Sequence, residues 1–136
     1  MIGYCRPQVV NVSDTEVVLS IPLNRRTRNH VGSMYIGAMT VGVDFVTGLT
    51  AMISIKKSKK NIVLIFKDLK SSFIKRAEGE TFFTCNHTKE IEAAVKKVVD
   101  SKQRVNIEVP IIATVPEKFG DEPVAEFIIT LSMKEK

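Results

Sequence analysis

The sequence predicts one α+β domain over residues 1–136, in which a curved antiparallel sheet wraps around a long apolar helix and a short amphipathic helix lies on the sheet. Three observations support this fold class. The stretch 32–55 carries a single formal charge, the C-terminal part alternates with a period of two, and 136 residues correspond to about one domain. A helix that is apolar nearly all round must be enclosed, and a curved sheet is the element able to enclose it.

The first elements are short strands. In the segment 17–23, every second residue is apolar, namely Val17, Leu19, Ile21 and Leu23. This period of two indicates a strand with one buried face. A weaker strand over 9–12 precedes it, and the turn-forming residues at 13–15 separate the two.

The stretch 32–55 is long enough to raise the question of a membrane span, for which about 18 consecutive apolar residues are the usual signal. Asp44 would then lie near the middle of the bilayer, where a charged side chain costs roughly 2.5–3.5 kcal/mol. Gly37, Gly42 and Gly48 further dilute the hydrophobicity. The alternating strands also need an apolar element to cover them, so we predict a buried helix and no membrane span.

Two strands and a second helix follow. The segment 61–75 begins as a continuous apolar run and then becomes mixed, and 81–86 forms a further short strand after a Glu-Gly-Glu turn. Thr88 then offers a side-chain oxygen that can cap a helix. Beyond it, an apolar stripe at helical spacing is formed by Ile91, Ala94, Val95, Val98 and Val99. This helix is amphipathic and therefore lies on a surface of the sheet.

The C-terminal part shows the clearest alternation. Apolar residues occupy the odd positions of 105–115 and again of 125–133. The run 116–123 between them contains two prolines and a glycine and is typical of a turn, so the two strands form an antiparallel hairpin. Pro110 cannot donate to a strand ladder and marks a bulge or an edge. Together the segments predict a sheet of about five or six strands.

Composition and charge narrow the function classes. With 44% hydrophobic and 26% charged residues, the chain is not a disordered tail, a collagen-like chain or a disulfide-dense mini-protein. The 20 basic and 15 acidic residues leave a net charge of +5, which suits an anionic small ligand or weak nucleic-acid affinity without arguing for either. Cys5 and Cys85 form no metal-ligand pattern and no signal peptide is recognisable, so a cytoplasmic location is expected.

The residues just before the long helix carry a family resemblance. Their sequence, Asn-His-Val-Gly-Ser-Met-Tyr-Ile-Gly, resembles the Asn-x-x-Gly-x-x-His-Gly-Gly segment of the hot-dog fold acyl-CoA thioesterases of the phenylacetyl-CoA type. Asn29 and Gly32 match this segment, and Gly37 matches its last glycine. Tyr35 stands where the family has its His, and Ile36 replaces the first glycine of the pair. The His-Gly pair is therefore absent from this chain.

The resemblance extends over essentially the whole chain. Asp44 falls nine residues after Tyr35, at the family's acidic position, and the segments 26–37 and 118–123 look like an uncharacterised thioesterase-like branch of the superfamily. The resemblance implies the hot-dog fold, hydrolysis of an acyl-CoA thioester, and a homodimer or a tetramer of two dimers. It also implies an active site at the subunit interface. The Gly37 and Asp44 of one such site then belong either to the same chain or to different chains. Coenzyme A enters as part of the substrate, so no separate cofactor is expected.

A thioester hydrolase needs a polarised carbonyl oxygen and a nucleophile delivered to the carbonyl carbon. Amide groups at the start of a helix are unpaired and partly positive, so the N–H of Gly37 is a candidate oxyanion donor, an interaction often worth roughly 2.7–4 kcal/mol. Asp44 lies about two turns further along and on nearly the same side of the helix. Within an apolar helix its pKa is expected to be raised, and it can activate water or attack the carbonyl itself.

Three further residues complete the candidate site. Tyr35 can donate a hydrogen bond to the substrate, and Asn29 can position the substrate or orient its own loop. Thr47, one turn beyond Asp44, can hold a water molecule or bond its own backbone. Structural roles stay open for the others as well, since Asp44 can pair with a hydroxyl or backbone group and Gly37 can serve close helix packing. No metal-binding spacing is present, so no metal is expected.

Two other functions stay open. In the first, the chain is a non-catalytic module that binds acyl-CoA or a fatty-acyl group, with Tyr35 and Ile36 filling the space of the thioester carbonyl. The second is nucleic-acid binding through the basic clusters 25–28 and 56–60, although either cluster can instead meet the phosphates of coenzyme A or simply be solvated. The expected partners are therefore an acyl thioester and further copies of the chain, and not nucleic acid.

Overall fold

The computed structural model describes residues 2–136, which form four helices and six strands. In chain order these are α1 (Ile2–Cys5), β1 (Gln8–Val12), β2 (Val17–Ile21), α2 (Ile36–Ser58), β3 (Ile62–Phe73), β4 (Thr81–Cys85), α3 (Thr88–Ser101), β5 (Val105–Thr114), α4 (Pro116–Phe119) and β6 (Pro123–Glu135). The combination of one long helix, a second shorter helix and an antiparallel sheet confirms the predicted α+β class.

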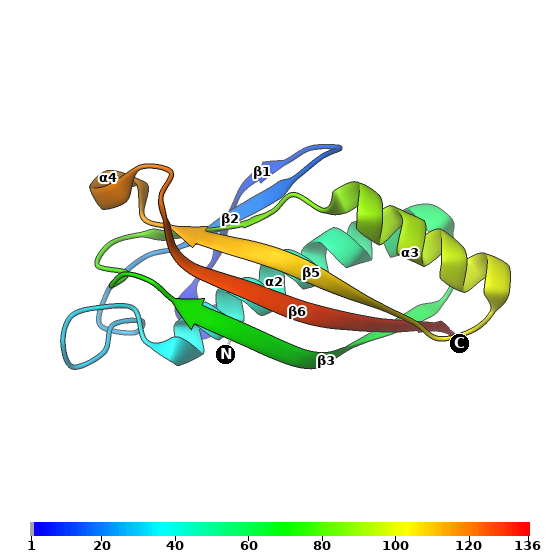
Figure 1. Ribbon diagram of the computed structural model, residues 1–136, viewed down its shortest axis with the longest axis horizontal. Helices are drawn as coiled ribbons and strands as arrows, with labels where there is room; N and C mark the ends of the chain where they lie inside the picture. The colour runs from blue at the N-terminus through cyan, green and yellow to red at the C-terminus, as the bar shows by residue number, and fades with distance from the viewer. Residues whose placement is uncertain (1) are drawn as a thin grey trace.

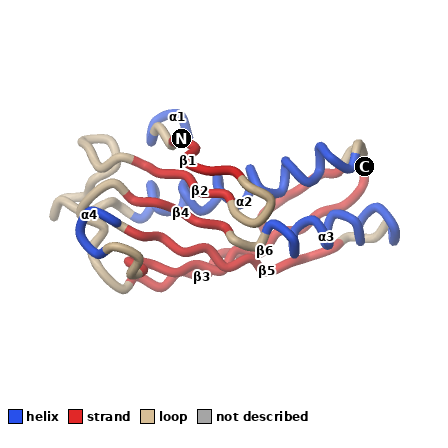
Figure 2. The backbone as a smooth tube through the Cα atoms, turned by 90° about the horizontal axis from the view of Figure 1, so that it is seen from above, coloured by secondary structure: helices blue, strands red, loops and turns tan. Residues whose placement is uncertain are grey.

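All six strands belong to one antiparallel sheet with the order β1-β2-β4-β5-β6-β3. The long strands β3, β6 and β5 lie side by side along α2, and the shorter β4, β2 and β1 continue the sheet around that helix (Figure 1). Figure 2 shows the strands running along the length of the molecule, with α3 at one end and α4 at the other. The two edges of the sheet are β1 and β3, and each has a strand partner on one side only.

Helix α2 supplies the centre of the core. Its buried face meets inward side chains of the sheet, including Leu19, Phe83 and Leu131, which are fully buried. Gly42 lies at the closest approach, since a Cβ at this position would be 2.4 Å from Cε1 of Phe83. Glycine at position 42 is therefore what lets α2 lie this near to β4.

By length and composition, α2 is the one described helix that would suffice to cross a membrane. Half of that apolar window is nevertheless buried within the protein, where it packs against the sheet and α3. This is the placement of a core helix, as the sequence predicts.

The amphipathic helix α3 packs on α2, β5 and β6. Its buried apolar residues are Ile91, Ala94, Val95 and Val98, which belong to the predicted stripe. The predicted capping role of Thr88 is wrong. His87 occupies the N-cap position, and Thr88 is already helical, with a buried hydroxyl that has no hydrogen-bond partner among the described residues. The chain reaches helical geometry one residue earlier than the sequence indicates.

The long helix begins at Ile36, directly before Gly37, as the sequence predicts, and residues 24–34 before it form turns in which Gly32 adopts a left-handed φ of +81°. One local feature differs from the sequence prediction. The segments α1 and α4 are additional single turns of helix, of 4 residues each. Four residues are too few to show a helical period, so neither turn was predicted.

Part of the surface of α2 and both edges of the sheet are left uncovered within the chain. Partly or largely exposed positions of α2, here called the outer stripe, recur every four residues and wind gradually around the helix: Ile36, Thr40, Asp44, Gly48 and Met52. Its ends are strongly exposed, with Ile36 at 66% and Met52 at 53%. On the free edge β3, Val63 and Ile65 are about half exposed. Large apolar side chains exposed on a helix and on a neighbouring edge strand are a candidate surface for interaction with another chain.

Candidate active site

Helix α2 begins with free amide groups. Tyr35 is the N-cap residue, with an extended backbone at φ −79° and ψ 160°, and its own N–H donates to the carbonyl of Thr27 at 2.9 Å. The first bond back to the helix start runs from the N–H of Met39 to the carbonyl of Tyr35, at 3.1 Å. The amide groups between them, including that of Gly37, have no acceptor among the described residues. They therefore carry the partial positive charge of the helix start.

The ring of Tyr35 lies over Gly37. A Cβ at Gly37 would be 2.3 Å from Cε2 of that ring, so a side chain at position 37 would displace it. Burial raises the pKa of Tyr35, and the neighbouring Cys5 side chain adds to the shift. The Tyr35 hydroxyl therefore keeps its proton at neutral pH and can donate a hydrogen bond.

Asp44 lies on the outer stripe seven residues after Gly37, which places it about 10 Å further along the helix axis. It lines a cavity of about 270 Å³ together with Thr40, Phe66, Lys67, Asp68, Leu69 and Ile129. These residues come from α2, β3 and β6, so the cavity lies between the helix and the free edge of the sheet. Burial raises the pKa of Asp44. A carboxylate that is partly desolvated and yet open to a cavity is typical of a general base.

A β-bulge in β3 shapes the Asp44 cavity. The register of β3 against β6 shifts between Phe66 and Asp68, so Lys67 is an extra residue on the edge strand. Asp68 accepts a hydrogen bond of 2.6 Å from the hydroxyl of Thr130 on β6. Lys67 and Asp68 were missed by the sequence analysis, because nothing in the sequence of β3 signals the bulge that brings both to this cavity.

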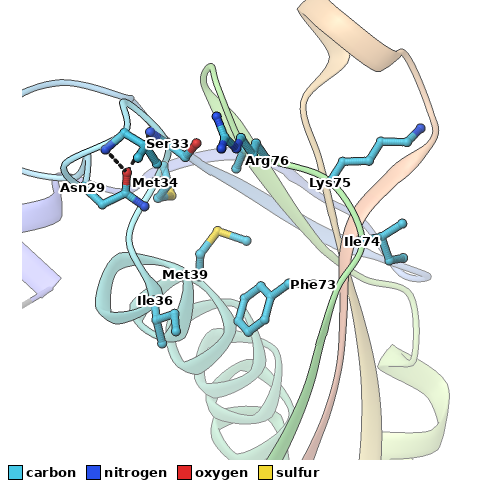
Figure 3. Close-up of a pocket in the computed structure, with 11 residues that line it drawn as sticks. Asn29, Ser33, Met34, Ile36, Met39, Phe73, Ile74, Lys75 and Arg76 are labelled. Atoms are coloured by element: carbon cyan, nitrogen blue, oxygen red, sulfur yellow. Dashed lines mark hydrogen bonds between the residues drawn. The ribbon is translucent and has the colours of Figure 1, made fainter.

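A second cavity, of about 420 Å³, opens at the start of α2 (Figure 3). Figure 3 shows Ile36 of α2 on one side of it and Phe73, at the end of β3, on the other. Asn29 also lines this cavity. Its Oδ1 accepts hydrogen bonds of 3.0 Å from the backbone N–H groups of Val31 and Ser33. Asn29 therefore orients its own loop at the edge of the cavity.

The predicted site residues fall into two groups. Tyr35 and Gly37 form the start of α2, close in the chain to the cavity that Asn29 lines, whereas Asp44 lines the separate cavity at β3. Thr47 is fully buried, and its hydroxyl donates to a carbonyl one turn back at 2.8 Å. The predicted contact of Thr47 with substrate therefore finds no support in this geometry.

A family model described as a domain of unknown function, DUF4442, matches residues 2–132. The chain belongs to the DUF4442 family. No curated protein matches this DUF4442 chain.

Solved structures show the fold of the DUF4442 chain in other proteins. One is a Pseudomonas aeruginosa protein of unknown function described as a probable thioesterase, with a TM-score of 0.81 and 18% identity over 97% of this chain and 85% of that chain. A Staphylococcus aureus thioesterase has a TM-score of 0.71 and 13% identity, over 98% and 97% of the two chains. A Haemophilus influenzae thioesterase has a TM-score of 0.71 and 8% identity, over 98% and 82%. At these identities the likeness establishes the fold, and the DUF4442 chain has the hot-dog fold that the sequence resemblance implied.

Proposed function

We propose that the DUF4442 chain hydrolyses an acyl thioester, such as an acyl-CoA, at an interface between two copies of the chain. One observation carries this proposal. The partly buried carboxylate of Asp44, with a pKa raised by burial, opens into a cavity on the same face of α2 as the free N–H of Gly37. A base and an oxyanion donor are the two groups that the reaction needs. The shared fold with thioesterases from Staphylococcus aureus and Haemophilus influenzae supports the same reaction class.

In the proposed reaction, the Asp44 carboxylate accepts a proton from a water molecule while the water oxygen bonds to the carbonyl carbon. The N–H of Gly37 holds the resulting oxyanion. Collapse of the intermediate breaks the carbon–sulfur bond, and the departing thiolate takes the proton held by Asp44. In a second route, the Asp44 carboxylate attacks the carbonyl carbon and the carbon–sulfur bond breaks, which releases the thiolate and leaves a mixed anhydride; water then cleaves the anhydride to the free acid and restores Asp44, and the thiolate takes up the proton released. Tyr35 and Asn29 position the substrate in both routes.

Within a single chain, the Gly37 amide and the Asp44 carboxylate are too far apart to act on one carbonyl group. Gly37 and Asp44 are about 10 Å apart along α2, whereas a donor must lie about 3 Å from the oxyanion. A two-fold contact between the outer stripes of two chains removes this difficulty. Antiparallel helices that cross near Thr40 place the Gly37 amide of each chain beside the Asp44 carboxylate of the other. The exposed apolar residues of the outer stripe and of β3 supply the surface for such a contact.

A second candidate function is a module that binds the acyl group without cleaving it. The position of the Tyr35 ring over Gly37 favours this function, because the ring limits the approach of a carbonyl to the helix start. Ile36, in contrast, lines the cavity at the start of α2 and is 66% exposed, so its side chain is not buried against the helix start.

The test is cleavage of acyl-CoAs of increasing chain length, followed by the release of free thiol. Asp44→Asn keeps the shape of the side chain and removes its basicity, so turnover should fall by about 10²–10⁴-fold while acyl-CoA binding persists. The substitution Asp100→Asn, on the exposed face of α3, is the matched control and should leave turnover unchanged. Undiminished turnover in Asp44→Asn would remove this carboxylate from the mechanism. Binding of acyl-CoA by the wild type, with no turnover of any thioester, would favour the binding module.

A further inference from the structure

Ser33 is a buried residue that lines the cavity at the start of α2, and its hydroxyl forms no hydrogen bond with any described residue. The residue is 5% exposed, and its Oγ has no hydrogen-bond partner among the described residues. Its backbone is held on both sides, because its N–H donates to Oδ1 of Asn29 at 3.0 Å and its carbonyl accepts from the N–H of Asn29 at 2.6 Å. Ser33 is therefore held at the cavity wall with its hydroxyl oxygen covered, but not satisfied, by the protein, and a turn about its Cα–Cβ bond would present that oxygen to the cavity.

The other walls of this cavity are mainly apolar. Met34, Met39 and Ala77 are buried there, and Ile36 and Phe73 are exposed at its rim. Its volume of about 420 Å³ falls within the range of small-ligand sites, about 300–1,000 Å³. An acyl group fits such walls, yet an unpaired hydroxyl in apolar surroundings is unfavourable. One polar group on an otherwise apolar ligand would satisfy it.

We propose that this cavity is the acyl-binding subsite and that Ser33 determines its specificity, by selecting compact acyl groups that carry a hydroxyl substituent. The inference rests on the proposed function, since Ser33 lies four residues before Gly37, whose N–H is to hold the oxyanion. A hydroxyl fits better than a carboxylate, because of the two cations at this cavity one is already paired and the other is exposed to solvent. Lys75 points away from the cavity and pairs with Glu122, and Arg76 is exposed to solvent (Figure 3).

The test uses thioesters that differ only by the hydroxyl group: butyryl-CoA, β-hydroxybutyryl-CoA and γ-hydroxybutyryl-CoA. Dissociation constants are measured by calorimetry in the Asp44→Asn background, in which the thioester stays intact. This parent should bind one of the hydroxylated thioesters roughly tenfold more tightly than butyryl-CoA, as expected for one well-placed hydrogen bond. Adding Ser33→Ala should abolish the preference, whereas Ser33→Thr, which retains a hydroxyl, should keep it.

A second buried serine provides the matched control. Ser54 is 4% exposed and also has an unpartnered hydroxyl, but it lines a different cavity between α2 and α3. Ser54→Ala should therefore leave the acyl preference unchanged. Without ligand, Ser33→Ala should unfold at the same or a higher temperature than its parent, because it removes an unpaired buried hydroxyl. A large loss of thermal stability would give Ser33 a structural role and overturn the inference.

The outcomes separate this inference from the proposed reaction. Equal affinity for the three thioesters, or a preference that survives Ser33→Ala, overturns the role of Ser33 whether or not the wild type hydrolyses them. A preference that depends on Ser33, without turnover in the wild type, upholds the subsite and overturns hydrolysis. Tighter binding of succinyl-CoA than of both hydroxyacyl-CoAs, lost in Arg76→Gln, would mean that the substituent is a carboxylate and that the inference is wrong.

Discussion

Replacing Gly37 by proline removes the amide hydrogen on which the proposed reaction depends. Position 37 lies in the first turn of α2, where the amide has no intrahelical acceptor, so proline is tolerated there. Gly37→Ala is the matched control, because it adds a Cβ only 2.3 Å from the Tyr35 ring but keeps the N–H. The ring must move in both variants, so the difference between them isolates the amide hydrogen. Loss of this donor should lower kcat by about 10²–10³-fold relative to Gly37→Ala.

The same variant shows whether two chains share one site. Gly37→Pro and Asp44→Asn chains are mixed in equal amounts, unfolded and refolded together, so that about half of the dimers contain one chain of each kind. If the Gly37 amide of one chain works with the Asp44 carboxylate of the other, each mixed dimer has one intact site and one doubly defective site. The mixture should then regain about one quarter of the wild-type activity, although each variant alone is nearly inactive.

The assay is release of free thiol from the acyl-CoA that the wild type cleaves best, with circular dichroism to show that each variant is folded. A second mixture, of wild type with the Gly37→Pro/Asp44→Asn double variant, gives an independent reading. It should retain about one quarter of the wild-type activity if the site is shared, and about half if each chain carries its own. Activity in the first mixture that stays at the level of the separate variants would refute the shared site.

Three further predictions concern charge and packing on α2. Because burial raises the pKa of Asp44, turnover should fall with decreasing pH at a midpoint above that of an ordinary aspartate, about 4, in a pH–rate profile. The pKa of this carboxyl is higher in the folded chain than in the unfolded chain. Its protonated form therefore contributes to stability below the unfolded-state pKa, and this contribution is lost as the pH rises through the folded-state pKa. Asp44→Asn should therefore raise the unfolding temperature at neutral pH, and this gain should vanish below about pH 4. A gain that persists below about pH 4 would show that burial of the charged carboxylate is not its cause. In urea unfolding, Gly42→Ala should destabilise the chain by roughly 1–3 kcal/mol, because its Cβ would lie 2.4 Å from the buried ring of Phe83. Gly48→Ala, with its nearest neighbour in Phe66 at 3.8 Å, should instead stabilise it by about 0.5–1 kcal/mol, and equal effects of the two changes would rule out the packing argument.

Much of the fold follows from periodicity alone. The alternation over 105–115 and 125–133 predicted the central strands β5 and β6, because a strand with one buried face must show it. Pro110 was predicted to mark a bulge or an edge. It pairs with Ile128 of β6, whereas β4 pairs with β5 only over 112–114, so β5 has an open edge at Pro110. The edge is therefore confirmed.

Short elements and single-residue roles were not predictable in this way. The helical turns α1 and α4 contain 4 residues each, too few for a period. The N-cap of α3 depends on the backbone dihedral angles of one residue, and periodicity does not distinguish Thr88 from His87 at that precision. The bulge at Lys67 depends on the pairing of β3 with β6, which the sequence of β3 alone does not contain.

The candidate site was predicted in part. Asp44 stood out because it is the only charge in 32–55, and Gly37 because of its place in the family resemblance. Ser33 and Lys67 did not stand out, since serine is common in loops and lysine on edge strands. Only the fold places them at cavities, namely an apolar cavity for Ser33 and the Asp44 cavity for Lys67.

The sequence by itself determined which side chains are apolar and with which period, and hence the α+β class and the shared side of α2 on which Gly37 and Asp44 lie. These are relations between near neighbours in the chain, and they hold before any segment meets another. Only the tertiary structure decided that Asp44 faces a cavity at β3, that Gly42 lies against Phe83, and that Ser33 lies near the end of β3 without a partner for its hydroxyl. Each of these depends on contacts between segments far apart in the sequence, and no local period encodes their distance or direction.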